Sequence, residues 1–193
     1  LSSMRLSMFF AAVGLLLLLS YTENASILSD SYASFFSKGK ITFFAEPRLD
    51  PRLHTITAYV INMDESQDRW QHMQSKLQPL GLRYARVSAV NGRALAQKEQ
   101  NRVVDQETFK RLRGRGPSAG EMGCSLSHYR ALKAFLSSKQ AYALILEDDV
   151  TFDPRQLRVQ LVELTTVHAK QWDVVTLQHS HRGLPKTIAP LSS

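Results

Sequence analysis

Residues 141–149, Ala-Tyr-Ala-Leu-Ile-Leu-Glu-Asp-Asp, join a run of apolar residues directly to three carboxylates. A short unbroken apolar run is typical of a strand that is buried on both faces of a parallel sheet. Acids that follow such a strand lie at its carboxyl end, where open α/β sheets bind their ligands. Neighbouring carboxylates repel one another, and a divalent cation that also holds a diphosphate would compensate them. The stretch predicts a ligand-binding sheet edge, and its alternative is an acidic turn in water.

Length and charge limit the class of protein. The 193 residues can form one domain of ordinary size with a hydrophobic core. The formal net charge of +7 would suit nucleic acid, an anionic membrane or a phosphorylated ligand. The sequence has no paired zinc ligands, no aromatic-basic RNA-binding signature and no basic heptads, so we expect no nucleic-acid partner. The single cysteine, Cys124, excludes an intramolecular disulfide framework and a cysteine-rich zinc site.

An apolar run near the N-terminus predicts export. Residues 8–19 form this run, and Arg5 precedes it. The run is shorter than the roughly 20 residues of a bilayer span and falls within the roughly 7–15 residues of a signal-peptide core. Cleavage after Ala25 would place Glu23 at position −3 of the cleavage site, where signal-peptide processing favours a small residue. We therefore expect residues 1–22 to be a signal anchor or a signal peptide, and both alternatives remain open.

The chain after this run is expected to lie outside the cytoplasm. An uncleaved anchor would attach it to the membrane, with the remainder in the Golgi or ER lumen of a eukaryote or in a bacterial envelope. Cleavage would release a secreted chain. Residues 23–56 carry serines and prolines without a sustained period, which predicts a stem or linker. The folded domain is expected over residues 57–193.

From residue 57 onward, strand and helix signals alternate. Strands are predicted over residues 57–62, 82–90, 141–146 and 172–177, and helices after cap residues at Ser66, Ser118 and Asp153. Residues 93–117 are polar and basic, which predicts a solvated loop, with phosphate contact as its alternative. This order of elements predicts an α/β sheet with a substantial parallel part.

Five segments resemble glycosyltransferase family 25, in the order in which that family carries them. They are residues 60–64 with Arg69, 87–92, 120–128, 143–150 and 172–177. The most distinctive is Gly-Glu-Met-Gly-Cys-Ser-Leu-Ser-His at 120–128, because it precedes the acidic strand end. Bacterial members of this family build lipooligosaccharide, and animal members galactosylate collagen hydroxylysine.

The resemblance implies a fold and an activity. The fold is expected to be a GT-A-like, Rossmann-like sheet that binds a nucleotide sugar and is flanked by helices. Family members continue beyond the last matched strand, so the fold is expected to be incomplete at the C-terminus. The activity is expected to be metal-assisted, inverting transfer of a hexose, as galactose from UDP-galactose, to a glycan or to the hydroxyl of a modified protein.

The resemblance also implies which residues hold the metal and the donor. Asp149 is expected to ligate Mn²⁺ or Mg²⁺, with Asp148 as a second ligand directed towards the ribose or a metal-bound water. Asp148 and Glu121 are expected to be catalytic. Donor contacts are expected from five further residues, namely Asn62, Arg69, Asn91, His128 and Glu147.

Ordinary structural roles remain open for several of these residues. Glu121 is the third residue of a capping box that begins at Ser118, which needs no catalytic role. Arg69 fits a helix-surface arginine and Asn62 a strand-terminating asparagine. His128 fits a hydrogen-bonded structural residue on a helix.

Two other functions are weighed against transfer. The first is a truncated or catalytically inactive homologue that acts as a binding or adhesion module, which an early C-terminus would favour. The second is a nucleotide-binding hydrolase or phosphotransferase. The sequence has no glycine-rich phosphate loop of either common type, which disfavours this second class.

Overall fold

The computed structural model describes residues 16–20, 39–44, 49–103 and 105–177, with side chains from residue 39 onward except at 101–103. The described strands are β1 (Leu16–Ser20), β2 (Ile41–Phe44), β3 (Ile56–Asn62), β4 (Arg83–Ser88), β5 (Tyr142–Glu147) and β6 (Val174–Thr176). The described α-helices are α2 (Gln67–Leu77), α3 (Gln97–Val103), α4 (Gln106–Arg113), α5 (Ala119–Ser138) and α6 (Pro154–Thr166). Short 3₁₀ turns occur at Pro51–Leu53, Gln78–Leu80 and Gly92–Ala94.

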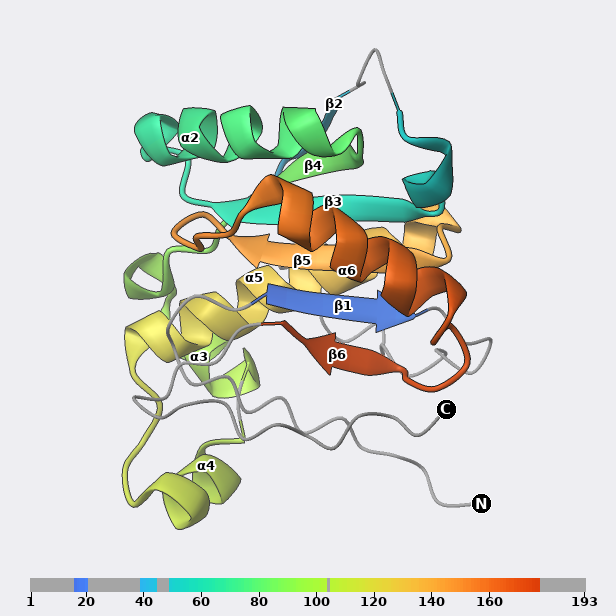
Figure 1. Cartoon of the computed structure of the whole chain (residues 1–193). Helices are drawn as coiled ribbons and strands as arrows, with labels where there is room; N and C mark the ends of the chain where they lie inside the picture. Colours follow the sequence, from blue (N-terminus) through green and yellow to red (C-terminus); the bar gives the residue numbers. More distant parts are fainter. Residues whose placement is uncertain (1–15, 21–38, 45–48, 104, 178–193) are drawn as a thin grey trace.

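The strands form one mixed sheet in the order β2-β4-β3-β5-β1-β6 (Figure 1). The centre is parallel, because Val60 of β3 pairs with Arg86 of β4 on one side and with Leu146 of β5 on the other. β2 is antiparallel to β4, and β1 is antiparallel to both β5 and β6. Parallel strands need crossover connections. α2 connects β3 to its neighbour β4, and α5 lies in the connection that leads from β4 past β3 to β5. The predicted α/β sheet with a parallel part is confirmed.

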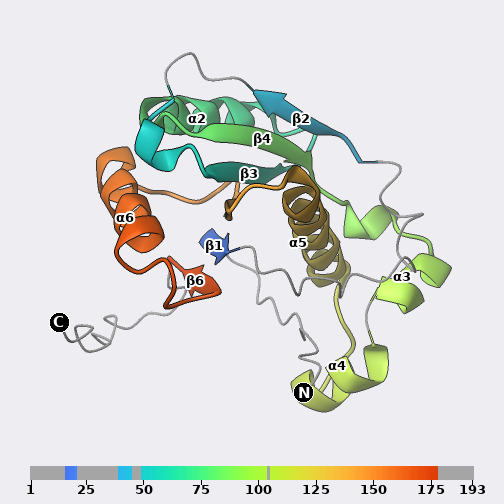
Figure 2. The same ribbon diagram turned by 90° about the vertical axis from the view of Figure 1, so that its right-hand side faces the viewer.

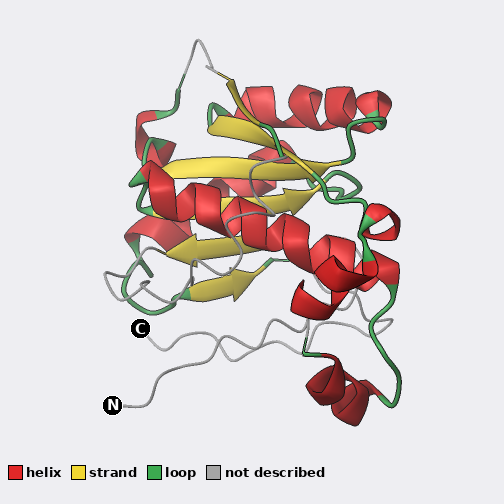
Figure 3. Cartoon of the chain, turned by 180° about the vertical axis from the view of Figure 1, so that it is seen from behind, coloured by secondary structure: helices red, strands yellow, loops and turns green. Residues whose placement is uncertain are grey.

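Helices cover both faces of this sheet. α2 and α6 lie on one face and α5 on the other (Figure 2). In the view from behind, α5 runs across the front of the sheet (Figure 3). Along β3, Ala58 and Val60 join the core under α2 and α6, whereas Tyr59 and Ile61 join the core under α5. Successive strand residues point to opposite faces, so a strand covered on both sides is apolar without interruption. The apolar run of β5 has the same cause.

Two of the three predicted helix caps form as expected. At α6, Asp153 Oδ1 accepts a hydrogen bond from the Gln156 backbone N–H at 2.8 Å, and Pro154 occupies the first turn. At α5, the predicted capping box is present. At α2, Ser66 is the N-cap residue, but its side chain makes no capping bond. Its hydroxyl instead accepts from Arg69 Nη2 at 3.0 Å, so this part of the prediction was wrong.

The loop predicted over residues 93–117 was wrong in part, because it contains α3 and α4. α4 begins where Asp105 Oδ1 accepts from the Thr108 backbone N–H at 3.0 Å, and it ends at Gly114 in the left-handed conformation. Local caps and turn chemistry define this short helix, since none of its residues is buried. The basic residues in its last turn suit the negative end of a helix dipole.

The sheet begins earlier than residue 57. Ile41–Phe44, which the sequence analysis placed in the stem, form the edge strand β2 beside β4. Phe44 stacks on Tyr84 with ring centroids 5.3 Å apart and contacts Trp70 at 5.2 Å. The sequence did not predict β2, because four residues are too few to show a periodic pattern and the residues that they contact are distant in the sequence.

Part of the predicted signal segment is described. Leu16–Ser20 form β1, and the rest of residues 1–22 lies outside the described residues. Across the described ranges, no helix has both the length and the apolar character that a membrane crossing requires. Membrane attachment therefore stays a prediction.

Candidate functional site

The carboxyl ends of the three parallel strands bring polar residues together at one edge of the sheet. Asn62 ends β3, Ser88 ends β4 and Glu147 ends β5, with Asp148 and Asp149 directly after it. This is the edge at which open α/β sheets bind their ligands. The acids that the sequence placed at a strand end therefore lie where the fold class predicts a site.

Asn62 connects β3 with three neighbouring segments. It is 1% exposed, and its Nδ2 donates to Asp148 Oδ2 at 2.6 Å and to the Ser66 carbonyl at 3.0 Å. Its Oδ1 accepts from Arg86 Nε at 2.7 Å. A buried amide needs such partners because leaving them unmade costs the desolvation of each group. The predicted donor-contact residue is therefore occupied by protein partners and sets the positions of Asp148 and Arg86.

Asp148 is a buried carboxylate that is held from two sides. It is 8% exposed, and its Oδ1 accepts from Arg69 Nη1 at 3.0 Å while Asn62 binds Oδ2. Burial raises the pKa of Asp148, and the hydrogen bond from Asn62 and the charge of Arg69 oppose this rise. Arg69 is bound at this edge with its side chain 46% exposed. Both terminal nitrogens of Arg69 are thus held by the protein, Nη1 by Asp148 and Nη2 by Ser66, while part of the side chain meets solvent.

The three consecutive acids lie in three different environments. Glu147 lies against α5, where its Oε1 is 2.9 Å from His128 Nε2 and 3.7 Å from Cys124 Sγ. Asp148 is held between β3 and α2, as described above. Asp149 is exposed. The acids therefore do not form one tight carboxylate cluster, and Asp149 is the one that is open to a ligand from solvent.

Glu121 is engaged at the start of α5. Its Oε2 accepts from the Ser118 backbone N–H at 2.8 Å, and its two oxygens accept from Arg115 Nη1 and Nη2 at 2.8 Å each. The Arg115 hydrogen bonds, followed by the Ser118 backbone bond, lower the pKa of Glu121 to about 2. A carboxylate with so low a pKa is a weak proton acceptor near neutrality. The geometry therefore accounts for Glu121 as a capping residue that also fixes a basic side chain.

A close backbone contact explains two glycines in the sequence. A Cβ on Gly123 would lie 2.5 Å from the Val90 carbonyl oxygen, and one on Gly92 would lie 1.7 Å from the Ala119 carbonyl oxygen. Ser127 Oγ reinforces the contact by accepting from the Val90 backbone N–H at 2.8 Å. The turn after β4 thus packs directly on the first turns of α5. This contact places α5, with Cys124 and His128, beside the end of β5.

Asn91 has a local role at this turn. It is exposed, and its Oδ1 accepts from the Arg93 backbone N–H at 3.0 Å, which caps the 3₁₀ turn. The donor contacts predicted for Asn62, Arg69, Asn91, His128 and Glu147 stay predictions.

Three polar residues of this edge, Arg86, Ser88 and Asp64, were not predicted as site residues. Arg86 binds Asn62, and Ser88 Oγ donates to Asp64 Oδ2 at 2.6 Å. Arg86 also lies with its guanidinium over the Trp70 ring, 5.6 Å from the centroid. For Arg86, the available signal was a charged residue between Ala85 and Val87 in the middle of a predicted strand, which indicates a satisfied polar contact when the strand is central.

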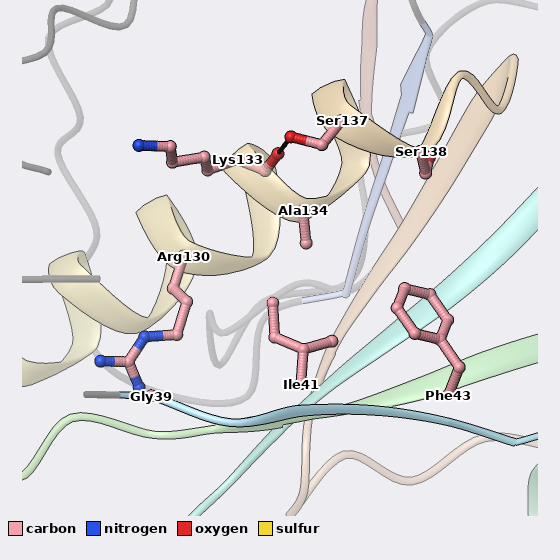
Figure 4. Close-up of a pocket in the computed structure, with 8 residues that line it drawn as sticks. All are labelled: Gly39, Ile41, Phe43, Arg130, Lys133, Ala134, Ser137 and Ser138. Carbon is pink, nitrogen blue, oxygen red and sulfur yellow. Dashed lines mark hydrogen bonds between the residues drawn. The ribbon is translucent and has the colours of Figure 1, made fainter. Parts of the chain in front are cut away.

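A cavity of about 460 Å³ lies elsewhere, between β2 and the C-terminal half of α5. Its lining includes Ile41, Phe43 and Ala134, whereas the Lys133 amine extends away from them (Figure 4). None of the described residues that line it is acidic, and none of them belongs to the acidic edge.

A parallel-centred α/β sheet with acids and cations at its carboxyl edge defines a ligand-binding α/β domain. The model of glycosyltransferase family 25 (LPS biosynthesis protein) matches residues 55–188. The chain belongs to glycosyltransferase family 25.

Curated relatives agree with this family. Procollagen galactosyltransferase 1-A of Xenopus laevis is 33% identical over 143 residues, which are 69% of this chain and 23% of the relative. A glycosyltransferase 25 family member of Drosophila pseudoobscura pseudoobscura is 33% identical over 50% of this chain and 16% of its own length. The probable inactive glycosyltransferase 25 family member 3 of Bos taurus is 27% identical over 74% of this chain and 26% of its own length. The chain thus spans between 16% and 26% of these relatives. No solved structure matches the chain.

Proposed function

We propose that this chain forms the donor-binding edge of a glycosyltransferase that transfers a hexose to a hydroxyl acceptor. The observation that carries the proposal is the network of Asn62, Asp148 and Arg69 beside the exposed Asp149. A positioned guanidinium fork complements phosphate oxygens, and an open carboxylate complements a divalent cation. Membership of family 25 supports this class of reaction.

The substrates follow from the relatives. The Xenopus laevis relative is named procollagen galactosyltransferase 1-A, which supports galactose from UDP-galactose as the donor sugar and a hydroxylated protein as an acceptor. The family description names LPS biosynthesis, which supports a glycan acceptor as the alternative. Export through the N-terminal segment would bring the chain to either kind of acceptor.

The residues of the edge fit a divalent metal through one open ligand. Asp149 would hold Mn²⁺ or Mg²⁺, with Asp148 as the neighbouring carboxylate in the sequence. The metal would neutralise charge on the departing diphosphate. Asn62 and Arg69 orient Asp148, and Arg69 offers the donor phosphates a cation that the protein already holds in place.

Inverting transfer by a single displacement needs a general base for the acceptor hydroxyl. Glu121 is paired with Arg115 and is therefore poorly suited to this task. Asp148 is better placed as an orienting carboxylate than as the base, because both its oxygens already accept hydrogen bonds.

A second candidate function is donor or glycan binding without transfer. The match to a probable inactive family member of Bos taurus favours it. The donor edge would be retained in such a protein, and turnover would be lost.

Titration calorimetry of the full chain with UDP, with and without Mn²⁺, tests the proposal. We expect UDP binding that depends on the metal and that Asp149→Ala abolishes. Glu107→Ala removes an exposed acid from the separate helix α4 and should leave UDP binding unchanged. A folded wild-type chain that binds no UDP in either condition would overturn the proposal.

Turnover separates the two candidate functions. Release of UDP from UDP-galactose in the presence of a hydroxylated acceptor supports transfer. Metal-dependent UDP binding without any turnover supports the binding module instead.

A further inference from the structure

Three side chains of different chemistry converge where α5 passes the end of β5. Cys124 and His128 are four residues apart on α5, so both project from the same side of the helix. Glu147 ends β5 opposite them, and its Oε1 lies 2.9 Å from His128 Nε2 and 3.7 Å from Cys124 Sγ. The three candidate ligand atoms all lie within 4.8 Å of one another. Two elements of the fold therefore bring a thiol, an imidazole and a carboxylate to one point.

The two separations that involve Glu147 are close to those of a tetrahedral metal site. Zn²⁺ binds sulfur at about 2.3 Å and nitrogen or oxygen at about 2.0–2.2 Å, which places neighbouring ligand atoms roughly 3.3–3.7 Å apart. The sulfur–oxygen separation of 3.7 Å already has this size. The nitrogen–oxygen separation of 2.9 Å needs to widen by only a few tenths of an ångström. Rotation of the Glu147 carboxylate would provide that change.

The chemistry of the three groups selects the class of metal. Thiolate and imidazole are ligands of Zn²⁺ and similar transition metals, whereas Mg²⁺ and Mn²⁺ prefer sites made of oxygens. The site also differs in burial from the exposed Asp149. His128 is 1% exposed, whereas Cys124 and Glu147 are each half-buried, so the ligands form a recess that is accessible beside these two residues.

We propose that Cys124, His128 and Glu147 form a Zn²⁺-type metal site, separate from the Asp149 position proposed for the donor metal. Three protein ligands leave a fourth position for water or a bound molecule, as in catalytic zinc sites. Binding replaces the His128–Glu147 hydrogen bond with two metal–ligand bonds. The thiol proton of Cys124 leaves to solvent, because the thiolate is the form that ligates metal.

Cobalt titration of the tag-free, metal-free full chain tests this site. A thiolate bound to Co²⁺ gives a charge-transfer absorption in the near ultraviolet that oxygen and nitrogen ligands do not give. Cys124 is the only cysteine in the sequence, so this band reports one side chain. We expect the band in the folded wild-type chain, saturation at one Co²⁺ per chain, and its loss when Zn²⁺ is added as a competitor.

Matched variants test Cys124 and His128 as ligands. Cys124→Ser should abolish the band, and His128→Gln should weaken Co²⁺ binding by at least about tenfold, since loss of even an outer-shell partner costs ~10–100-fold in metal affinity. His72→Gln, which removes an exposed histidine from α2, should leave the titration unchanged. Asp149→Ala should also leave it unchanged, although it is expected to abolish metal-dependent UDP binding.

Several outcomes overturn the site. A wild-type chain with a native circular dichroism spectrum and no charge-transfer band shows that Cys124 binds no such metal. Undiminished Zn²⁺ affinity in folded Cys124→Ser or His128→Gln shows that the metal binds elsewhere. These measurements contain no nucleotide, so their failure leaves the proposed donor edge untouched, and failure of UDP binding leaves this site untouched.

Discussion

Asn62 Nδ2 donates a hydrogen bond to Asp148 Oδ2 at 2.6 Å, which joins the ends of β3 and β5 across 86 positions of sequence. Asn62 holds Arg86 through its other amide atom. The bond lies between two side chains that are almost fully buried. It therefore fixes a carboxylate at the sheet edge and contributes to the stability of the domain.

Asn62→Leu should destabilise the domain by about 2 kcal/mol, because Asp148 would keep its burial and lose a donor. Urea unfolding followed by circular dichroism measures this loss. Asn91→Ala is the matched control, since Asn91 is exposed and caps only a 3₁₀ turn, and it should cost about 0.5 kcal/mol. Equal losses in the two variants would contradict a special role for the buried bond.

Gly123→Ala should destabilise the domain by more than about 2 kcal/mol, because its Cβ would lie 2.5 Å from the Val90 carbonyl oxygen. Gly120→Ala in the same helix has no atom nearer than 3.9 Å to its new Cβ. That control should be neutral or stabilising by up to about 1 kcal/mol. Thermal unfolding of the pair measures the difference, and a stable Gly123→Ala variant would show that the turn and α5 are not in contact.

The Glu121–Arg115 pair should make stability depend on acid pH. The pKa of Glu121 falls from 4.5 to about 2 in the folded chain, chiefly through the Arg115 hydrogen bonds. A depressed pKa means that the stabilisation is complete above pH 4.5 and is lost as the pH falls towards 2. The advantage of wild type over Glu121→Gln in unfolding free energy should therefore shrink across this range.

Arg115→Gln is the control for this pH dependence. It removes the largest cause of the low pKa, so it should abolish most of the same pH-dependent difference. Unfolding curves recorded at several pH values give the comparison. A difference between wild type and Glu121→Gln that stays constant with pH would show that the pair does not form in solution.

Phe44→Ala should cost about 1–3 kcal/mol of stability, because partly buried Phe44 packs on Trp70 and Tyr84. Phe43→Ala next to it should cost less than about 1 kcal/mol, since Phe43 is 61% exposed. Chemical unfolding of the two variants tests whether β2 belongs to the folded domain. If neither substitution changes the free energy of unfolding, residues 41–44 do not pack on the domain and belong to the stem.

The sequence alone determined the elements with strong local signals. The apolar runs of β3 and β5, the capping box at Ser118 and the Asp153 cap each depend on residues that are neighbours along the chain. The motif at 120–128 and the acids at 147–149 also identified the family from the sequence, and the family model agrees. Short-range patterns carry such information because periodicity and capping involve only a few adjacent residues.

Only the tertiary structure decided which neighbours each site residue contacts. The sequence places Glu147, Asp148 and Asp149 side by side, whereas the fold directs Glu147 to α5, holds Asp148 beside Asn62 and leaves Asp149 exposed. The edge strand β2 likewise depends on contacts with distant residues. Alternate residues at a strand end face different neighbours, and those neighbours come from segments whose distance in the sequence hides their contact. The sequence therefore determined which acids stand at the sheet edge, and packing determined which of them is free to bind a ligand.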